Sequence, residues 1–183
     1  MNIETAQKLY GELGEFIRKD TSDVADKVGS SCLSNDTYFN ALEYTDLMFY
    51  RTLSHIRIFS GGDGDGFLST LRSTFERALT KIKEAKGFAR VILVNDEIPL
   101  FLKEMQGKHS YVLEIIPVQV KEGIELSHYI VCDDNMLRDE KSHKKLTPDT
   151  DIKEIKASVY FDNQAKAKNF AEKFDNLWKF LKG

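Results

Sequence analysis

The chain has 183 residues, 42% of them apolar and 30% charged, and a formal net charge of −3 at pH 7. This length and composition predict one globular domain that buries a core without disulfides or metal ions. The charge balance excludes a general attraction to nucleic acid or anionic membrane, so only a local basic patch could supply one. Since no run of eighteen apolar residues and no signal-peptide pattern occur, we expect a soluble, cytoplasmic protein. Cys32 and Cys132 lack metal-ligand spacing and are expected to be reduced thiols.

The first fifty residues are predicted to be mostly helical. Thr5 to Lys19 carries apolar residues at helical spacing, although two internal glycines weaken the pattern. Residues 21–36 are small and polar and predict a loop. Asp36 or Thr37 can then cap a second helix, which has apolar surface on more than one face and should pack on the sheet or on a second subunit. We therefore expect a helical N-terminal extension over residues 1–53.

From residue 54 the pattern becomes that of a strand, a helix and a second strand. An apolar alternation begins at Ile56 and leads into a glycine-rich segment, after which Phe67 to Ile82 places apolar residues three and four apart. Gly87 stands where a left-handed helix C-cap is expected, and residues 89–96 (ARVILVND) predict a buried strand. A crossover of this length implies a parallel pair with a right-handed connection.

The rest of the chain predicts a short helix over Glu97 to Gln106, three more strands and a closing helix. The strands are expected in residues 110–118, in residues 126–138 with a turn at Asp133, Asp134 and Asn135, and in residues 152–161. Pro117 suggests that the first of these lies at a sheet edge, and the charged residues 138–151 suggest an exposed loop or an extension of the hairpin. The prediction is an α/β domain over residues 54–183, with a mainly parallel sheet flanked by helices and an antiparallel hairpin near one edge.

A glycine loop connects the first strand of this domain to its helix. It comprises Ser60, Gly61, Gly62, Asp63, Gly64, Asp65 and Gly66. Backbone N–H groups at a helix start can bind a phosphate, so the loop is a candidate ligand-binding site. It lacks the lysine of GxxxxGK[ST], and its two aspartates repel an anion, so a flexible turn is the competing interpretation. A calcium loop does not fit, because Gly61 and Arg72 occupy positions that require carboxylates.

His128 lies in the sequence HYIVCDD, and here the order of elements resembles a known family. From Ser54 to Lys182 that order resembles one half of the phospholipase D superfamily, in which a hairpin strand carries HxKxxxxD. The segments SVYFDN and EKFDNLW are similar to the last strand and helix of degenerate, bacterial phospholipase D-like domains. The resemblance implies a phospholipase D-like fold and names His128 as the candidate catalytic residue.

The resemblance also implies what this chain lacks. In active members the histidine attacks a phosphodiester and the lysine neutralises the phosphoryl oxygens. Here Ile130 stands at the lysine position and Asn135 at the aspartate position. A second HxK at His143 and Lys145 has Thr150 where its aspartate should stand. We therefore expect a non-catalytic binding or assembly module of a bacterial cytosolic system, without cofactor or metal.

Three further expectations concern partners and alternatives. The half-domains of the family meet face to face, so a homodimer or another protein partner is expected. A nucleotide- or phosphate-binding domain using the glycine loop is one alternative, and a residual phosphodiesterase or nuclease using His128 or His143 is another. Lysines on the last helix leave nucleic-acid binding open.

Overall fold

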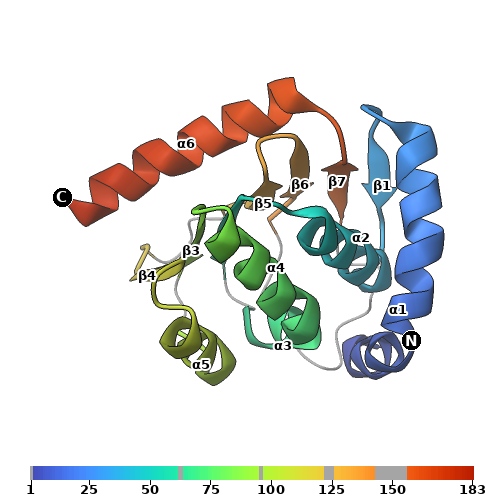
Figure 1. Cartoon of the computed structure of the whole chain (residues 1–183), viewed down its shortest axis with the longest axis horizontal. Coiled ribbons are helices and arrows are strands. Elements are labelled where there is room, and N and C mark those ends of the chain that lie inside the picture. Colours follow the sequence, from blue (N-terminus) through green and yellow to red (C-terminus); the bar gives the residue numbers. More distant parts are fainter. Residues whose placement is uncertain (1, 62–63, 95–96, 122–125, 143–155) are drawn as a thin grey trace.

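The computed structural model describes residues 2–61, 64–94, 97–121, 126–142 and 156–183. Six helices and seven strands lie in this part of the chain (Figure 1). In chain order they are α1 (Ile3–Val28), β1 (Leu33–Asn35), α2 (Tyr38–Arg51), β2 (His55–Gly61), α3 (Gly64–Thr70), α4 (Arg72–Glu84), β3 (Phe88–Val94), α5 (Leu100–Lys108), β4 (Leu113–Val118), β5 (His128–Cys132), β6 (Met136–Glu140), β7 (Ala157–Tyr160) and α6 (Gln164–Lys182).

The strands form one sheet in the order β1-β7-β6-β5-β2-β3-β4. β2, β3 and β4 are parallel neighbours, as the strand–helix–strand pattern predicts. The other four pairings are antiparallel. The mixed α/β fold is confirmed, but the expectation of a mainly parallel sheet is wrong, because the hairpin strands continue through β7 to β1 instead of ending at an edge. Pro117 lies in β4, an edge strand, as expected.

The N-terminal helix is longer than the sequence predicts. α1 runs to Val28, so residues 21–28 are helical and the predicted loop is wrong there. Tertiary contacts explain the extension, because the Arg51 guanidinium of α2 donates to Ser22 Oγ and to Asp26, each at 2.7 Å. Gly29, with φ of 57°, ends the helix. The predicted second helix is α2, capped by Thr37.

The helix predicted after the glycine loop is divided in two. α3 begins at Gly64 and a turn at Leu71 separates it from α4. The hydroxyls of Ser69 and Thr70 donate to the Gly66 carbonyl, which offers the backbone an alternative to continuous helix geometry. At the end of α4 the left-handed residue is Lys86, with φ of 57°, and not Gly87 as the sequence predicts.

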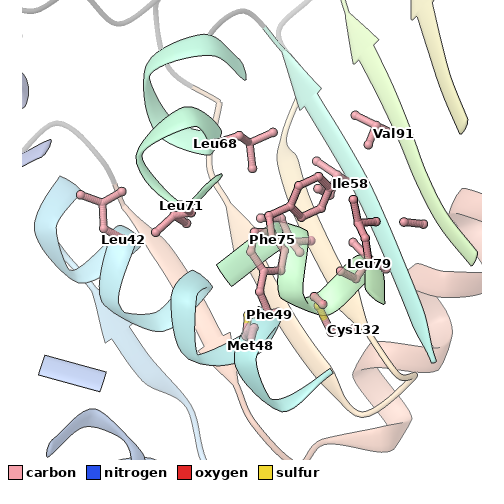
Figure 2. Close-up of a cluster of buried hydrophobic side chains, with 14 of the residues drawn as sticks. Leu42, Met48, Phe49, Ile58, Leu68, Leu71, Phe75, Leu79, Val91 and Cys132 are labelled. Atoms are coloured by element: carbon pink, nitrogen blue, oxygen red, sulfur yellow. The ribbon is translucent and has the colours of Figure 1, made fainter. Parts of the chain in front are cut away.

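The main core lies between the sheet and the helices α1 to α5. Figure 2 shows apolar side chains from α2, α3 and α4 meeting side chains of β2, β3 and β5. Phe49 and Phe75 are fully buried there, with ring centroids 5.2 Å apart. Residues of α1 and α2 belong to this same cluster, and β1 adds a strand to the sheet. The domain boundary between residues 53 and 54 stays a prediction.

α6 lies on the opposite face of the sheet (Figure 1), where Phe174 and Trp178 stack against each other in a second core cluster. Ion pairs made by the buried Arg57 fix the helix to β2. The Arg57 guanidinium donates to both carboxylate oxygens of Asp175 on α6, at 3.0 and 2.9 Å, and to Asp134 at 2.8 Å. Burial alone would lower the pKa of Arg57, but the two carboxylates raise it. Arg57 is therefore charged whenever the fold is intact.

We expect Asp175→Asn to lower the free energy of unfolding by about 2 kcal/mol, because Arg57 then loses one charged partner while it stays buried. Chemical denaturation followed by circular dichroism measures the difference. Glu172→Gln, on the exposed side of the same helix, is the matched control and should change stability by less than about 0.5 kcal/mol. Equal effects of the two variants would contradict this role of Asp175.

Candidate functional site

His128 is the first residue of β5, at the end of the sheet where β2 enters the glycine loop. The register pairs Phe59 of β2 with Tyr129 of β5. Ser60 follows Phe59 and His128 precedes Tyr129, so the two strands bring these two predicted site residues to the same end of the sheet. Ile130 belongs to the core cluster under α1 to α5, and His128, two residues earlier, points to that face. Both Ser60 and His128 are half-buried.

A row of buried polar residues extends from His128 across the sheet. His128 is opposite Glu140 of β6, Glu140 is opposite Ala157 of β7, and Ala157 is opposite Asn35 of β1. Residues directly opposite one another in a sheet share a face, so this row lies on the side covered by the helices. Asn35 and Glu140 are almost inaccessible to solvent. We call the group formed by Asn35, His128, Arg138 and Glu140 the polar row.

Arg138 supplies the cation of the polar row. Its Nη1 donates to Glu140 Oε2 at 2.6 Å, and its Nε donates to Asn35 Oδ1 at 3.3 Å. The guanidinium also lies 5.2 Å from the ring centroid of Phe67, on the helix that follows the glycine loop. Only 4% of the Arg138 side chain and 6% of the Glu140 side chain are exposed. The positive charge is thus held by a carboxylate inside the protein.

The register relates Arg138 to the lysine position of HxKxxxxD. Arg138 is directly opposite Ile130, the residue at that position, so a cation stands on the neighbouring strand instead. Glu140 is directly opposite His128, so Arg138, two residues before Glu140, is the diagonal neighbour of His128. Diagonal neighbours in a sheet are about 7–8 Å apart. The cross-strand neighbour of the imidazole is therefore an anion, and the nearby cation is already paired with that anion.

The contacts of the polar row do not test the other predicted site residues, which lie in the glycine loop and in the second HxK. Gly62 and Asp63 lie outside the described residues, as do His143 and Lys145 of the second HxK. Gly61 ends β2, and Gly64, Asp65 and Gly66 form the first turn of α3. Ligand binding by the glycine loop stays a prediction. No cluster of three or more potential metal ligands occurs in the described part of the chain.

The turn that follows β5 has a structural role. Asp133 and Asp134 both have positive φ, and the N–H of Asn135 donates to the Cys132 carbonyl, which makes the predicted turn a tight one. The Asp133 carboxylate accepts the backbone N–H groups of Leu53, Ser54 and His55, at 2.5 to 2.8 Å. It therefore joins the end of the hairpin to the start of β2, at the end of β5 opposite to His128.

Neither cysteine forms a disulfide, in agreement with the sequence. Cys132 is fully buried beneath the helices, and burial raises the pKa of its thiol to about 12. The thiol is therefore protonated at neutral pH and is not a nucleophile. Among the described helices, none combines the length and the hydrophobicity that crossing a membrane requires.

Sequence reasoning missed Arg138, Glu140 and Asn35. The sequence predicts an exposed loop or an extension of the hairpin here; the hairpin extension is correct, since both Arg138 and Glu140 lie in β6, but the exposure is wrong because both are buried. The available signal is the period of two that runs through Met136, Arg138 and Glu140 and continues the hairpin. Charged residues at strand positions are usually exposed, which is why the pattern predicts exposure for both of them.

The chain is similar to known proteins in its fold, but its sequence matches no known family. No family model matches the chain, and no curated protein sequence matches it. The archaeal chromatin protein TrmBL2, described with a novel mode of DNA binding, aligns with 94% of this chain and 64% of its own length, at a TM-score of 0.57 and 15% identity. The chain therefore spans less than two thirds of TrmBL2.

Two further solved structures are similar. Nuc from Salmonella typhimurium, a phospholipase D family member, covers 81% of this chain and 94% of its own length, with a TM-score of 0.56 and 10% identity. Phosphatidylserine synthase from Haemophilus influenzae Rd KW20 covers 80% of this chain and 37% of its own length, with a TM-score of 0.51 and 13% identity. These identities show likeness of fold alone. On that evidence the chain has a phospholipase D-like fold.

Proposed function

We propose that this chain is a non-catalytic binding or assembly module built on a phospholipase D-like fold. The observation that carries the proposal is the buried pair of Arg138 and Glu140. Phosphodiester cleavage by a histidine needs a cation that is available to the phosphoryl oxygens as their charge develops. Here the guanidinium on the face of His128 is bonded to a carboxylate at 2.6 Å.

The position of Glu140 strengthens this argument. Its cross-strand partner is His128, so a phosphodiester that approaches the imidazole also approaches a buried carboxylate. Because that carboxylate is already paired with Arg138 at 2.6 Å, the pair is neutral overall and offers a phosphodiester no net positive charge. The polar row thus favours an uncharged polar ligand, or no small ligand, over a phosphodiester.

A cavity beside the polar row offers a place for binding. It has a volume of about 270 Å³, and Ser127, Glu140 and Lys141 contribute to its lining. Lys156 from the other side of the hairpin and Asp36 line it as well, so its walls carry both charges. Its carboxylates Asp36, Asp139 and Glu140 outnumber its two lysines, so this lining suits hydrogen bonding to a polar partner group better than binding of an anion.

The assembly role is supported by α1. Leu13, Phe16 and Val24 are exposed on this helix, and Phe16 is 81% accessible. The sequence predicts that α2 packs on the sheet or on a second subunit, and its buried apolar residues belong to the core cluster shared with α1 and the sheet. We propose that any second copy of the chain, or another protein partner, packs against α1.

Nucleic-acid binding is a second candidate function. It is supported by the fold shared with the DNA-binding chromatin protein TrmBL2. It is also supported by Lys168 and Lys179 on the exposed side of α6. Glu172 between them weakens the local positive potential, which leaves this candidate behind the first.

The test of the proposed function is a turnover measurement with purified protein and bis(p-nitrophenyl) phosphate in the presence of EDTA. We expect no release of p-nitrophenol above the buffer rate, and no difference between the wild-type chain and His128→Ala. Ser127→Ala, a change at the exposed neighbouring residue, is the matched control. Turnover that is retained in Ser127→Ala and abolished in His128→Ala would overturn the proposal.

A further inference from the structure

A basic cluster surrounds Tyr50 on the surface formed by α1, α2 and α4, away from the polar row. The Cζ atoms of Arg18 and Arg77 lie 5.1 and 5.7 Å from the centroid of the Tyr50 ring, and Lys81 Nζ lies 5.2 Å from it. The ring is 43% exposed. Three cations from two other helices therefore converge on one accessible aromatic side chain.

A cavity of about 430 Å³ opens beside this ring. Its lining consists of Glu15, Arg18, Lys19, Ser22, Asp23, Leu47, Tyr50 and Arg77. Hydroxyl and guanidinium donors thus face the same space from three helices. Ser22 Oγ accepts a hydrogen bond from Arg51 at 2.7 Å, which leaves the Ser22 hydroxyl proton for another acceptor.

Two of the three cations are already used in the fold. Arg18 donates from Nε to Asp46 at 2.6 Å and from Nη2 to Thr74 at 3.1 Å. Lys81 donates to the backbone carbonyls of Tyr50 and Thr52 at the end of α2. The Nη1 donors of Arg18 are not part of these bonds, and they belong to a side chain that lines the cavity.

Arg77 differs from both. Within the described part of the chain, neither Arg77 nor Lys19 has a carboxylate within ion-pair distance. The pKa of Lys81 is lowered, first by burial and then by the charge of Arg77, which shows that like charges meet here. Asp46 balances Arg18, and Asp133 acts on Lys81 with the opposite charge. Among the residues that line the cavity, the three cations Arg18, Lys19 and Arg77 outnumber the two carboxylates Glu15 and Asp23.

We propose that this cavity binds a phosphate group, with Arg77 as its bidentate ligand and with Tyr50 and Ser22 as hydroxyl donors. A guanidinium matches the geometry of two phosphate oxygens, and the anion relieves the repulsion between Arg77 and Lys81. The site is independent of the polar row and of the glycine loop. The phosphate group belongs either to free inorganic phosphate or to a phosphate monoester.

Titration calorimetry at low ionic strength, with inorganic phosphate and separately with phenyl phosphate, tests this site. We expect saturable binding at one site per chain, and we expect Arg77→Gln to weaken it at least tenfold. Lys83→Gln removes an exposed cation from the same helix outside the cavity and should change affinity by less than twofold. Tighter binding of the inorganic ion identifies free phosphate as the ligand, and tighter binding of the ester identifies a monoester.

Three results would overturn the proposal: no saturable binding of either probe, equal weakening in both variants, or unchanged affinity in Arg77→Gln. Equal weakening would mean that the anion responds only to total charge. Thermal unfolding of Arg77→Gln checks that the variant is folded. Because the polar row takes no part in this site, failure here leaves the proposed function standing, and the phosphodiester turnover test does not depend on Arg77.

Discussion

We expect Gly87→Ala to lower the free energy of unfolding by about 3 kcal/mol. A Cβ atom at this position would lie 1.8 Å from the Ser54 carbonyl oxygen and 2.7 Å from its carbonyl carbon. These are backbone atoms and cannot rotate away. The neighbouring N–H of Phe88 donates to the same Ser54 oxygen at 3.1 Å, so relieving the clash pulls apart the start of β2 and β3.

Urea denaturation followed by circular dichroism measures this effect. The control is Gly11→Ala in the exposed middle of α1, where an added Cβ meets no atom within 4 Å. That variant should be more stable than the wild-type chain by about 0.5 to 1 kcal/mol, because alanine favours the helix. A Gly87→Ala protein as stable as the wild type would show that β2 and β3 do not meet as described.

Gly87 also shows how a sequence signal can be correct for a different reason. A glycine after a helix usually adopts the left-handed conformation itself. Here Lys86 takes that conformation. The N–H of Gly87 donates to the Ile82 carbonyl, and this hydrogen bond caps the C-terminus of α4. The glycine is required by the carbonyl of Ser54, which is distant in sequence. Local pattern predicts the position but not this contact.

The parallel core of the fold follows from local pattern, while the remaining strands do not. The alternation at Ile56 and the run over residues 89–96 predict β2 and β3, because each strand has its own apolar signal. β1 has only three residues, from Leu33 to Asn35, and it exists because β7 offers a free edge. The second half of α1 depends similarly on Arg51 of α2. Both features come from tertiary contacts.

The candidate site is predictable only in part for the same reason. His128 and Ser60 were each identified from short motifs, and their position at the same end of the sheet follows from the antiparallel pairing of β2 with β5. Arg138 and Glu140 carry no motif. Their role depends on strand register, since a shift of one residue would place both on the opposite face of the sheet.

Removing the charge of Glu140 should create an anion site where the wild-type chain has none. In Glu140→Gln the amide oxygen can still accept from Arg138, so the hydrogen bond survives while the neutralising charge is lost. The variant should lose up to about 3 kcal/mol of stability, because the buried guanidinium then has no carboxylate partner among the residues that the structure describes. Phosphate binds the folded state alone, and the variant gains a site in addition to the one proposed at Arg77, so phosphate should stabilise the variant more than it stabilises the wild-type chain.

The central claim is that Glu140 neutralises the charge of Arg138 and so prevents anion binding beside His128. An NMR titration with inorganic phosphate tests it most directly. The titration follows the ring resonances of His128, which are assigned by comparison with His128→Ala. In the wild-type chain and in Asp139→Asn, a change on the opposite face of β6, these resonances should not respond. In Glu140→Gln they should shift saturably, with an affinity at least tenfold above any wild-type response. A wild-type His128 that responds to phosphate as strongly as the variant would contradict the account.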